Sequence, residues 1–132
     1  MKGAIEMSEI EITSENFETE VLQSELPVLV DFWASWCGPC KAEMPNLKAV
    51  YEKFHGDQFD MLSVAVWDEP EDTIESAAEL GIPWNQIINA QKFPTELYGI
   101  DGIPHIILFG PDGTIVKREL RGAAIEAAVK EA

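Results

Sequence analysis

The chain has 132 residues, 46% hydrophobic and 25% charged, and its 24 acidic against nine basic residues give a formal net charge of −15. This size and composition are typical of a globular protein, so we expect residues 1–132 to form a single domain. The negative charge repels nucleic acids and acidic lipid surfaces, and no stretch approaches the roughly 20 apolar residues of a membrane span. We therefore expect neither nucleic-acid binding nor membrane insertion.

The stretch from Met1 to Met7 lacks the apolar core of a signal peptide, which predicts a cytoplasmic protein.

The N-terminal part of the chain is predicted to hold two strands and a helix. Residues 9–13 indicate a short edge strand and residues 15–22 a helix. Residues 28–34 are apolar except for Asp31, which is typical of a central strand buried on both faces.

A second helix follows this strand. It should run from Pro39 or Cys40 to Phe54, with a kink at Pro45 because proline cannot donate a helical hydrogen bond. Residues 59–67 predict another buried strand. Strand, helix and strand then form a βαβ unit with parallel strands and a right-handed crossover.

The second half of the chain is predicted to hold three more helices, one irregular stretch and a hairpin. They are a helix from Glu69 to a stop at Gly81, an irregular stretch over 82–91, a short helix over 93–98, a hairpin of strands 105–109 and 114–120, and a closing helix over 123–132.

The sequence Cys37-Gly38-Pro39-Cys40 holds the only two cysteines of the chain, at the junction between a buried strand and a helix. Unpaired backbone N–H groups at a helix N-terminus stabilise a thiolate, the form of cysteine that attacks disulfides. Two intervening residues also bring the sulfurs within bridging distance, and Gly38 and Pro39 permit the tight turn and restrain it. The spacing favours a redox-active dithiol, and a structural disulfide or a metal-ligand pair is the alternative.

Two segments carry a resemblance to a known family. The stretch from Val28 to Lys41, with its Trp-Cys-Gly-Pro-Cys core, closely resembles the active-site segment of thioredoxins, and the stretch from Tyr98 to Pro104 resembles their cis-proline loop. The likeness extends from about Ile10 over nearly the whole chain. It implies an α/β thioredoxin fold, in which a mixed five-stranded sheet is flanked by helices and the dithiol faces a cis-proline.

The chain is longer than an ordinary thioredoxin between the dithiol and the cis-proline loop. Residues 68–93 should supply an extra helix and loop, as in the thiol-disulfide oxidoreductases of the TlpA type. Because those relatives are commonly exported or membrane-tethered, export is the alternative to a cytoplasmic location.

The resemblance implies a catalytic role for four residues. Cys37 is the expected nucleophile, and Cys40 is the resolving thiol that breaks the mixed disulfide. Asp31 matches the buried carboxylate of the family, and burial should raise its pKa and suit it to accept the proton of Cys40. Glu43 could share that task, or it could be a solvated helix residue. A lysine lies near this carboxylate in ordinary thioredoxins, and Val66 is expected at its position here.

The expected docking surface lies around the dithiol. Substrate should contact Trp36, Gly38, Pro39, Ile103 and Pro104, with the backbone of Ile103 pairing with an extended substrate strand. His105 should come near the dithiol, but one histidine with two distant cysteines lacks the spacing of metal ligands, so no metal is expected.

These residues together predict a thiol-disulfide oxidoreductase that reduces protein disulfides without a diffusible cofactor. Its expected partners are disulfide-containing proteins and an upstream disulfide reductase, and we expect a monomer. A peroxidase of the peroxiredoxin kind is a weaker alternative, since that family has threonine where this chain has Ala34. A binding module whose cysteines hold a metal or are structural is the alternative from another class.

Overall fold

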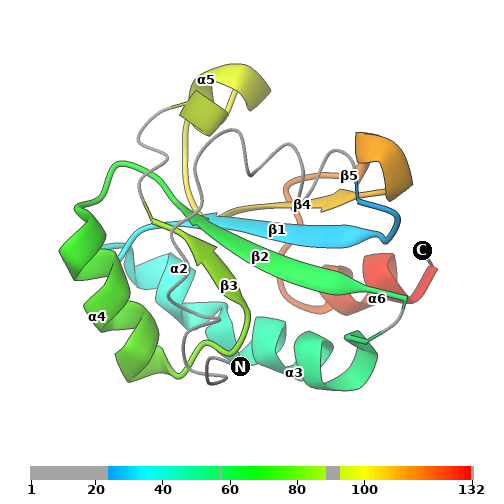
Figure 1. The fold of residues 1–132 in the computed structure, drawn as a ribbon, viewed down its shortest axis with the longest axis horizontal. Coiled ribbons are helices and arrows are strands. Elements are labelled where there is room, and N and C mark those ends of the chain that lie inside the picture. The colour runs from blue at the N-terminus through cyan, green and yellow to red at the C-terminus, as the bar shows by residue number, and fades with distance from the viewer. Residues whose placement is uncertain (1–23, 57, 89–92, 132) are drawn as a thin grey trace.

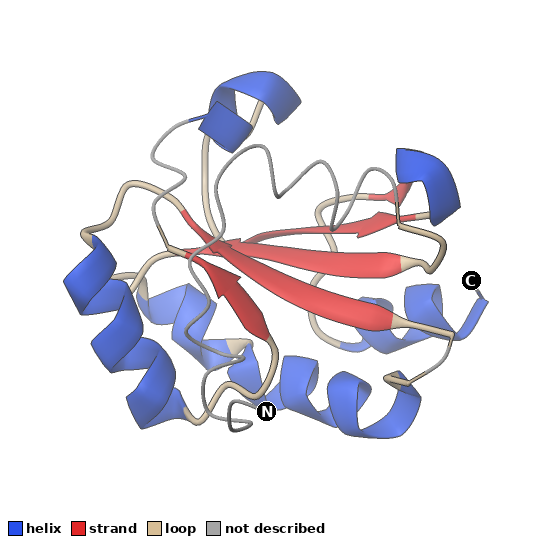
Figure 2. Cartoon of the chain, viewed as in Figure 1, coloured by secondary structure: helices blue, strands red, loops and turns tan. Residues whose placement is uncertain are grey.

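The computed structural model describes residues 24–56, 58–88 and 93–131 (Figure 1). The strand expected over residues 9–13 and the helix expected over 15–22 lie outside the described residues. A five-stranded sheet in the order β3-β2-β1-β4-β5 forms the centre of the fold, with helices on either side (Figure 2). The predicted thioredoxin fold, with a mixed sheet flanked by helices, is confirmed.

The sheet combines parallel and antiparallel pairs. Its strands are β1 (Val28–Trp33), β2 (Asp60–Ala65), β3 (Asn85–Ile87), β4 (His105–Phe109) and β5 (Ile115–Lys117). Strand β1 pairs in parallel with β2 and antiparallel with β4, and every residue of β1 is buried. The expected central strand and the parallel βαβ unit are therefore confirmed.

The helix after the cysteines is broken. Helix α2 (Gly38–Ala42) begins one or two residues earlier than expected, and α3 (Met44–Phe54) follows after a break at Glu43. Pro45 lies in the first turn of α3, where its missing N–H is not needed. The kink predicted at Pro45 is thus a full division of the helix just before it.

The segment that lengthens the chain contains a helix and a strand. Helix α4 (Pro70–Leu80) ends at Gly81, which adopts a left-handed conformation with φ of 66° that favours glycine. The prediction that 82–91 is irregular was wrong for residues 85–87, which form β3 and pair in parallel with β2, whereas 82–84 and 88 belong to no helix or strand. A strand of three residues is too short to show an alternating pattern, and only pairing with β2 defines it.

The C-terminal half agrees with the predicted elements, and α5 and β4 have the predicted bounds. Helix α5 (Phe93–Tyr98) was expected, β4 and β5 form the antiparallel hairpin, and α6 (Ala123–Glu131) closes the chain. A short 3-10 turn over Pro111–Gly113 joins the two hairpin strands, and β5 covers only part of the range 114–120.

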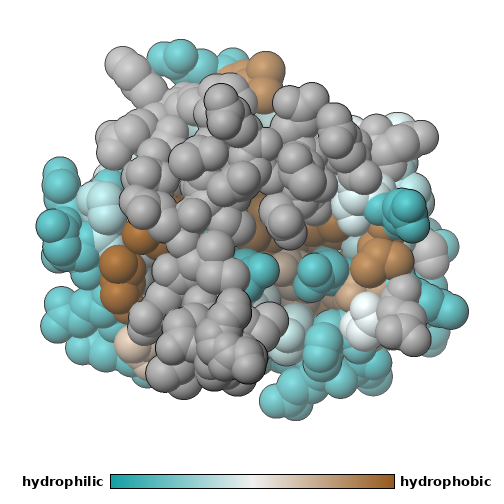
Figure 3. Space-filling model, in the orientation of Figure 1, coloured by the Kyte–Doolittle hydropathy of each residue, from teal (hydrophilic) through white to brown (hydrophobic). Residues whose placement is uncertain are grey.

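The apolar core has two parts, one on each face of the sheet. Helices α3 and α6 lie on one side of the sheet and α5 on the other (Figure 1). Leu29 and Trp33 of β1 pack with Cys40 and with residues of α3 and α6, whereas Val30 and Phe32 pack on the α5 side. In Figure 3, hydrophilic residues appear along the periphery of the molecule, and some hydrophobic residues are visible nearer its centre. Because side chains alternate along a strand, Asp31 points to the same side as Leu29 and Trp33, the side of the cysteines.

Candidate active site

Cys37 and Cys40 form a disulfide at the N-terminus of α2. The sulfur atoms are 2.15 Å apart and the Cα atoms 5.3 Å apart. Cys37 caps the helix, and its sulfur accepts a hydrogen bond of 3.1 Å from the backbone N–H of Cys40. After reduction this N–H and the helix dipole would stabilise a thiolate on Cys37. Gly38 and Pro39 are exposed in the first turn between the two sulfurs.

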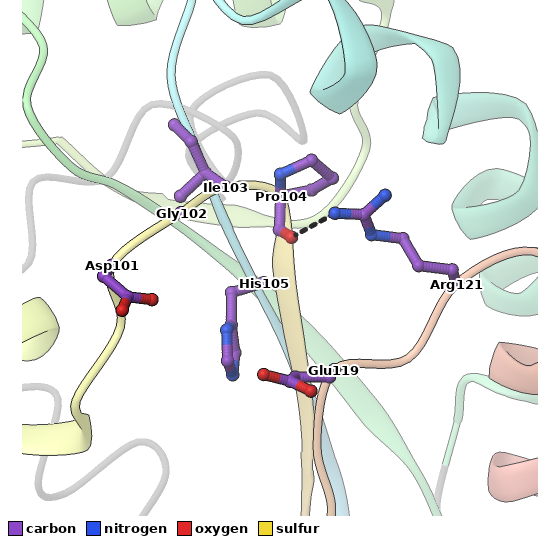
Figure 4. A pocket seen from close by; sticks show the side chains of 7 residues that line it. All are labelled: Asp101, Gly102, Ile103, Pro104, His105, Glu119 and Arg121. Atoms are coloured by element: carbon purple, nitrogen blue, oxygen red, sulfur yellow. Dashed lines mark hydrogen bonds between the residues drawn. The ribbon is translucent and has the colours of Figure 1, made fainter.

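The loop with the expected cis-proline lies opposite the disulfide. The Ile103–Pro104 peptide bond is cis, as predicted, and the carbonyl oxygen of Ile103 is 3.8 Å from the sulfur of Cys37. The guanidinium of Arg121 donates a hydrogen bond of 3.1 Å to the carbonyl oxygen of Pro104 (Figure 4). The segment after β5 therefore contacts the loop that faces the disulfide.

A pocket of about 360 Å³ adjoins this loop, lined by polar side chains from both segments. Asp101, His105, Glu119 and Arg121 surround it, as Figure 4 shows. His105 is buried, and its ring nitrogen Nε2 is 3.3 Å from the guanidinium of Arg118. Burial lowers the pKa of His105, and the neighbouring arginine Arg118 lowers it further, against the opposing charges of Glu119 and Asp101.

The loop before Cys37 is tied to the segment before α4. The carboxylate of Asp68 accepts hydrogen bonds from the backbone N–H of Ser35 at 2.8 Å, the hydroxyl of Ser35 at 2.9 Å and the hydroxyl of Thr73 at 2.8 Å. Trp36 is 61% exposed, and its indole N–H donates to the carbonyl oxygen of Trp67 at 2.9 Å. The segment that lengthens the chain thus fixes the loop that carries the exposed tryptophan.

Asp31 is 1% exposed in the middle of β1. The hydroxyl of Ser63, its partner on β2, donates a long hydrogen bond of 3.4 Å to Oδ2, and Oδ1 has no hydrogen-bond partner among the described residues. Burial raises the pKa of Asp31 from 3.8 to about 7, the Ser63 hydrogen bond opposes this, and the negative charge of Glu43 adds to it. The predicted rise in pKa is confirmed.

The residue that meets Asp31 from β2 differs from the expected one. Val66 belongs to the apolar cluster on the other face of the sheet. Its side chain therefore does not face the carboxylate of Asp31. Ser63 lies there instead, because paired residues of parallel strands point to the same face. A neutral serine therefore faces Asp31 from β2.

Glu43 lies between α2 and α3 and is half-buried. Both of its carboxylate oxygens are 3.3 Å from the backbone N–H of Gly122, which precedes α6, and one accepts 3.1 Å from the amide of Asn46. A solvated helix glutamate, one of the two interpretations of the sequence, would not make these contacts. Glu43 instead holds the start of α6 near the active site while its charge acts on Asp31.

The sequence did not single out Ser63, Asp68 or Arg121. Each of them hydrogen-bonds to a residue far along the chain. Only the register of β1 and β2 could have indicated Ser63 as the neighbour of Asp31. Among the described residues, no group of three or more His, Cys, Asp or Glu side chains is arranged to hold a metal ion. In the same part of the chain, no helix is both long and apolar enough to cross a bilayer.

Comparison with known proteins gives the family of the chain. The family model described as Thioredoxin matches residues 8–96. A thioredoxin of Mycolicibacterium smegmatis is 36% identical over 115 residues, which cover 86% of this chain and 93% of that protein. A thioredoxin of Streptomyces clavuligerus is 44% identical over 71 residues, covering 54% of this chain and 61% of that protein.

Solved structures agree with these relatives. The thioredoxin domain of a thiol-disulfide oxidoreductase from Bacteroides vulgatus superimposes with a TM-score of 0.76 at 37% identity, covering 82% of this chain and 79% of that one. A thiol:disulfide interchange protein from a Bacteroides species gives a TM-score of 0.72, also at 37% identity, over 81% of this chain and 72% of that one. The family model, the relatives and the fold around the disulfide all lead to the same assignment: the chain belongs to the thioredoxin family.

Proposed function

We propose that this protein reduces disulfides of other proteins by cycling Cys37 and Cys40 between dithiol and disulfide. The observation that carries the proposal is the disulfide at the N-terminus of α2, where the N–H of Cys40 points at the sulfur of Cys37. Membership of the thioredoxin family and the likeness to thiol-disulfide oxidoreductases support this chemistry. Neither favours a peroxidase or a non-catalytic binding module.

The proposed cycle has two exchange steps. In the first, the Cys37 thiolate attacks a substrate disulfide, forms a mixed disulfide and releases one substrate thiolate. In the second, Cys40 loses its proton and attacks the sulfur of Cys37, so that the Cys37–Cys40 disulfide forms and the second substrate sulfur leaves as a thiolate. Two electrons pass from the dithiol to the substrate, and no diffusible cofactor is required.

Asp31 is the proposed acceptor of the Cys40 proton. Its pKa of about 7 leaves a substantial fraction ionised at neutral pH and makes the carboxylate more basic than an exposed one. Asp31 and Cys40 belong to the same side of the sheet, and both are 1% exposed. Glu43 has a supporting role, since its charge raises the basicity of Asp31.

The proposed docking surface surrounds the disulfide. It would comprise Trp36, Gly38 and Pro39, which are exposed next to Cys37, and Ile103 and Pro104, in the loop whose carbonyl at Ile103 is 3.8 Å from the Cys37 sulfur. A substrate strand that pairs with the backbone of Ile103 would bring its disulfide to Cys37, the sulfur nearest to that loop.

The remaining expectations concern the setting of the protein. We propose a monomer that acts in the cytoplasm and is recharged by an upstream disulfide reductase, with export as the alternative location. Light scattering during gel filtration tests the monomer, and fractionation of cells that express the native gene tests the location.

The experiment that tests the function is reduction of insulin disulfides. Cys37→Ser should abolish turnover, and Cys40→Ser should accumulate a mixed disulfide at Cys37 because the resolving thiol is missing. Mass spectrometry after brief alkylation of the reduced wild-type protein should find Cys37 modified first. Faster alkylation of Cys40 would reverse the assigned roles.

A further inference from the structure

A second buried tryptophan reaches the catalytic carboxylate through a serine. Trp84 lies between α4 and β3, in the segment that lengthens the chain, and is 1% exposed. Its indole N–H donates a short hydrogen bond of 2.7 Å to the hydroxyl oxygen of Ser63, which is itself fully buried. Ser63 in turn donates to Oδ2 of Asp31 at 3.4 Å. The three side chains form a continuous path from the added segment to the proposed proton acceptor.

When Asp31 is ionised, the chemistry of the three groups fixes the direction of the hydrogen bonds. An indole N–H can only donate, and a serine hydroxyl has one hydrogen to give. Since the oxygen of Ser63 already accepts from Trp84, its hydrogen is free for another partner, and Asp31 is its only other hydrogen-bond partner among the described residues. A donor to the hydroxyl oxygen also polarises the O–H bond and strengthens the bond that the hydroxyl donates.

A donated hydrogen bond favours the ionised form of Asp31, in the direction opposite to burial. Burial and the charge of Glu43 raise the pKa of Asp31, and the Ser63 hydrogen bond lowers it. On this side of the sheet, Tyr51 of α3 packs against Trp84 with ring centroids 5.3 Å apart, and the thiols of Cys37 and Cys40 titrate here after reduction. The direct neighbour of Asp31 on β4, Ile106, carries no charge. Without the serine, more of the carboxyl would be protonated at neutral pH and unable to take up a proton.

We propose that Trp84 and Ser63 are positioning residues that hold the serine hydroxyl as a donor to Asp31 and so keep the carboxylate available for the proton of Cys40. The inference rests on the proposed role of Asp31 in the second exchange step. In that step the proton moves from the Cys40 thiol to the Asp31 carboxylate, the Cys40 sulfur bonds to Cys37, and the substrate sulfur leaves with the electron pair of the broken bond.

The test is the pH profile of the second step in Ser63→Ala and Trp84→Phe. A mixed disulfide between Cys37 and thionitrobenzoate is formed in acid with Ellman's reagent, and a pH jump in a stopped-flow instrument starts the release of thionitrobenzoate by Cys40. Ser63→Ala should move the midpoint of the profile upward by about one pH unit, as expected for loss of a hydrogen bond to a charged group, which is about a tenfold slower release at acidic pH.

Trp84→Phe keeps an aromatic ring and removes only the donor. It should move the midpoint in the same direction by a smaller amount, because the freed hydroxyl can then turn away from Asp31. If Ser63→Ala does not fold, this variant carries the test alone.

Trp33→Phe is the matched control. Trp33 is also fully buried, but its indole N–H donates to Gln86 at 3.1 Å and not to Ser63. The midpoint of the pH profile of Trp33→Phe should therefore equal that of the wild type. Midpoints of Ser63→Ala and Trp84→Phe that equal the control, while Asp31→Asn still slows the release, would overturn this inference and leave the role of Asp31 intact. An unchanged release rate in Asp31→Asn would overturn the role of Asp31 and this inference with it.

Discussion

Replacing Asp31 by asparagine should change the stability of the fold in a way that depends on pH. The folded protein holds the Asp31 proton up to about pH 7, whereas the unfolded chain releases it near 3.8. The folded state is therefore favoured fully below pH 3.8, and this advantage is lost as the pH rises through about 7. The difference between the two pKa values corresponds to about 4 kcal/mol. Asparagine does not titrate, so the variant avoids this loss.

The substitution has a cost that does not depend on pH. Oδ1 of Asp31 has no partner among the described residues, and an amide in its place would bury polar hydrogens without an acceptor, at about 1–3 kcal/mol. We therefore expect Asp31→Asn to be less stable than the wild type by about 1–3 kcal/mol near pH 4 and more stable by about the same amount near pH 8.

Guanidinium unfolding of the oxidised protein at several pH values, followed by tryptophan fluorescence, measures this difference. Asp72→Asn, a change at an exposed residue of α4, is the control and should show no comparable dependence on pH. A stability difference for Asp31→Asn that is constant between acidic and alkaline pH would refute the raised pKa. The same variant should slow the release of the mixed disulfide by Cys40 more than the first attack by Cys37, as measured by stopped-flow kinetics.

Three further variants test the surroundings of the site. Glu43→Gln removes the charge that raises the pKa of Asp31, so the midpoint of the second exchange step should move to lower pH, and an upward shift would contradict this electrostatic role. Asp68→Asn weakens the bonds to the loop before Cys37 and should lower the free energy of unfolding by about 1–3 kcal/mol, whereas Asp72→Asn should change it by at most about 1 kcal/mol. Arg121→Ala removes the hydrogen bond to the carbonyl of Pro104 and should raise KM for insulin about fivefold with little change in kcat, a cost of about 1 kcal/mol in binding. An equal rise in KM for Lys117→Ala, at an exposed residue of β5, would show that loss of positive charge alone explains the effect.

Much of the active site follows from short stretches of sequence. The apolar run over 28–34 predicted a buried central strand, and the two cysteines directly after it were correctly expected at a helix N-terminus. Pro45 and Gly81 marked the break before α3 and the end of α4. These features depend on backbone geometry within a few residues, which the side chains of those residues determine.

Other parts of the site depend on which strands pair and in what register. Ser63 faces Asp31 from 32 residues away, and Gly122 meets Glu43 from 79 residues away. A shift of one residue in the pairing of β1 and β2 would have turned Ser63 to the opposite face, so only the register shows that Ser63, and not Val66, faces Asp31. The short strand β3 was missed for a related reason, since only its pairing with β2 distinguishes it from a loop.

The sequence by itself determined that two cysteines, separated by a glycine and a proline, lie at a helix N-terminus after an apolar strand, because these elements are local, and this placement favours dithiol chemistry. It also determined that Asp31 would be costly to bury. The tertiary structure decided how that cost is balanced, since the partners of Asp31 come from β2, from the break before α3 and, through Ser63, from Trp84 in the added segment. The pKa of a buried group is set by the few charges and donors within contact distance, and those are brought together only when distant segments pack.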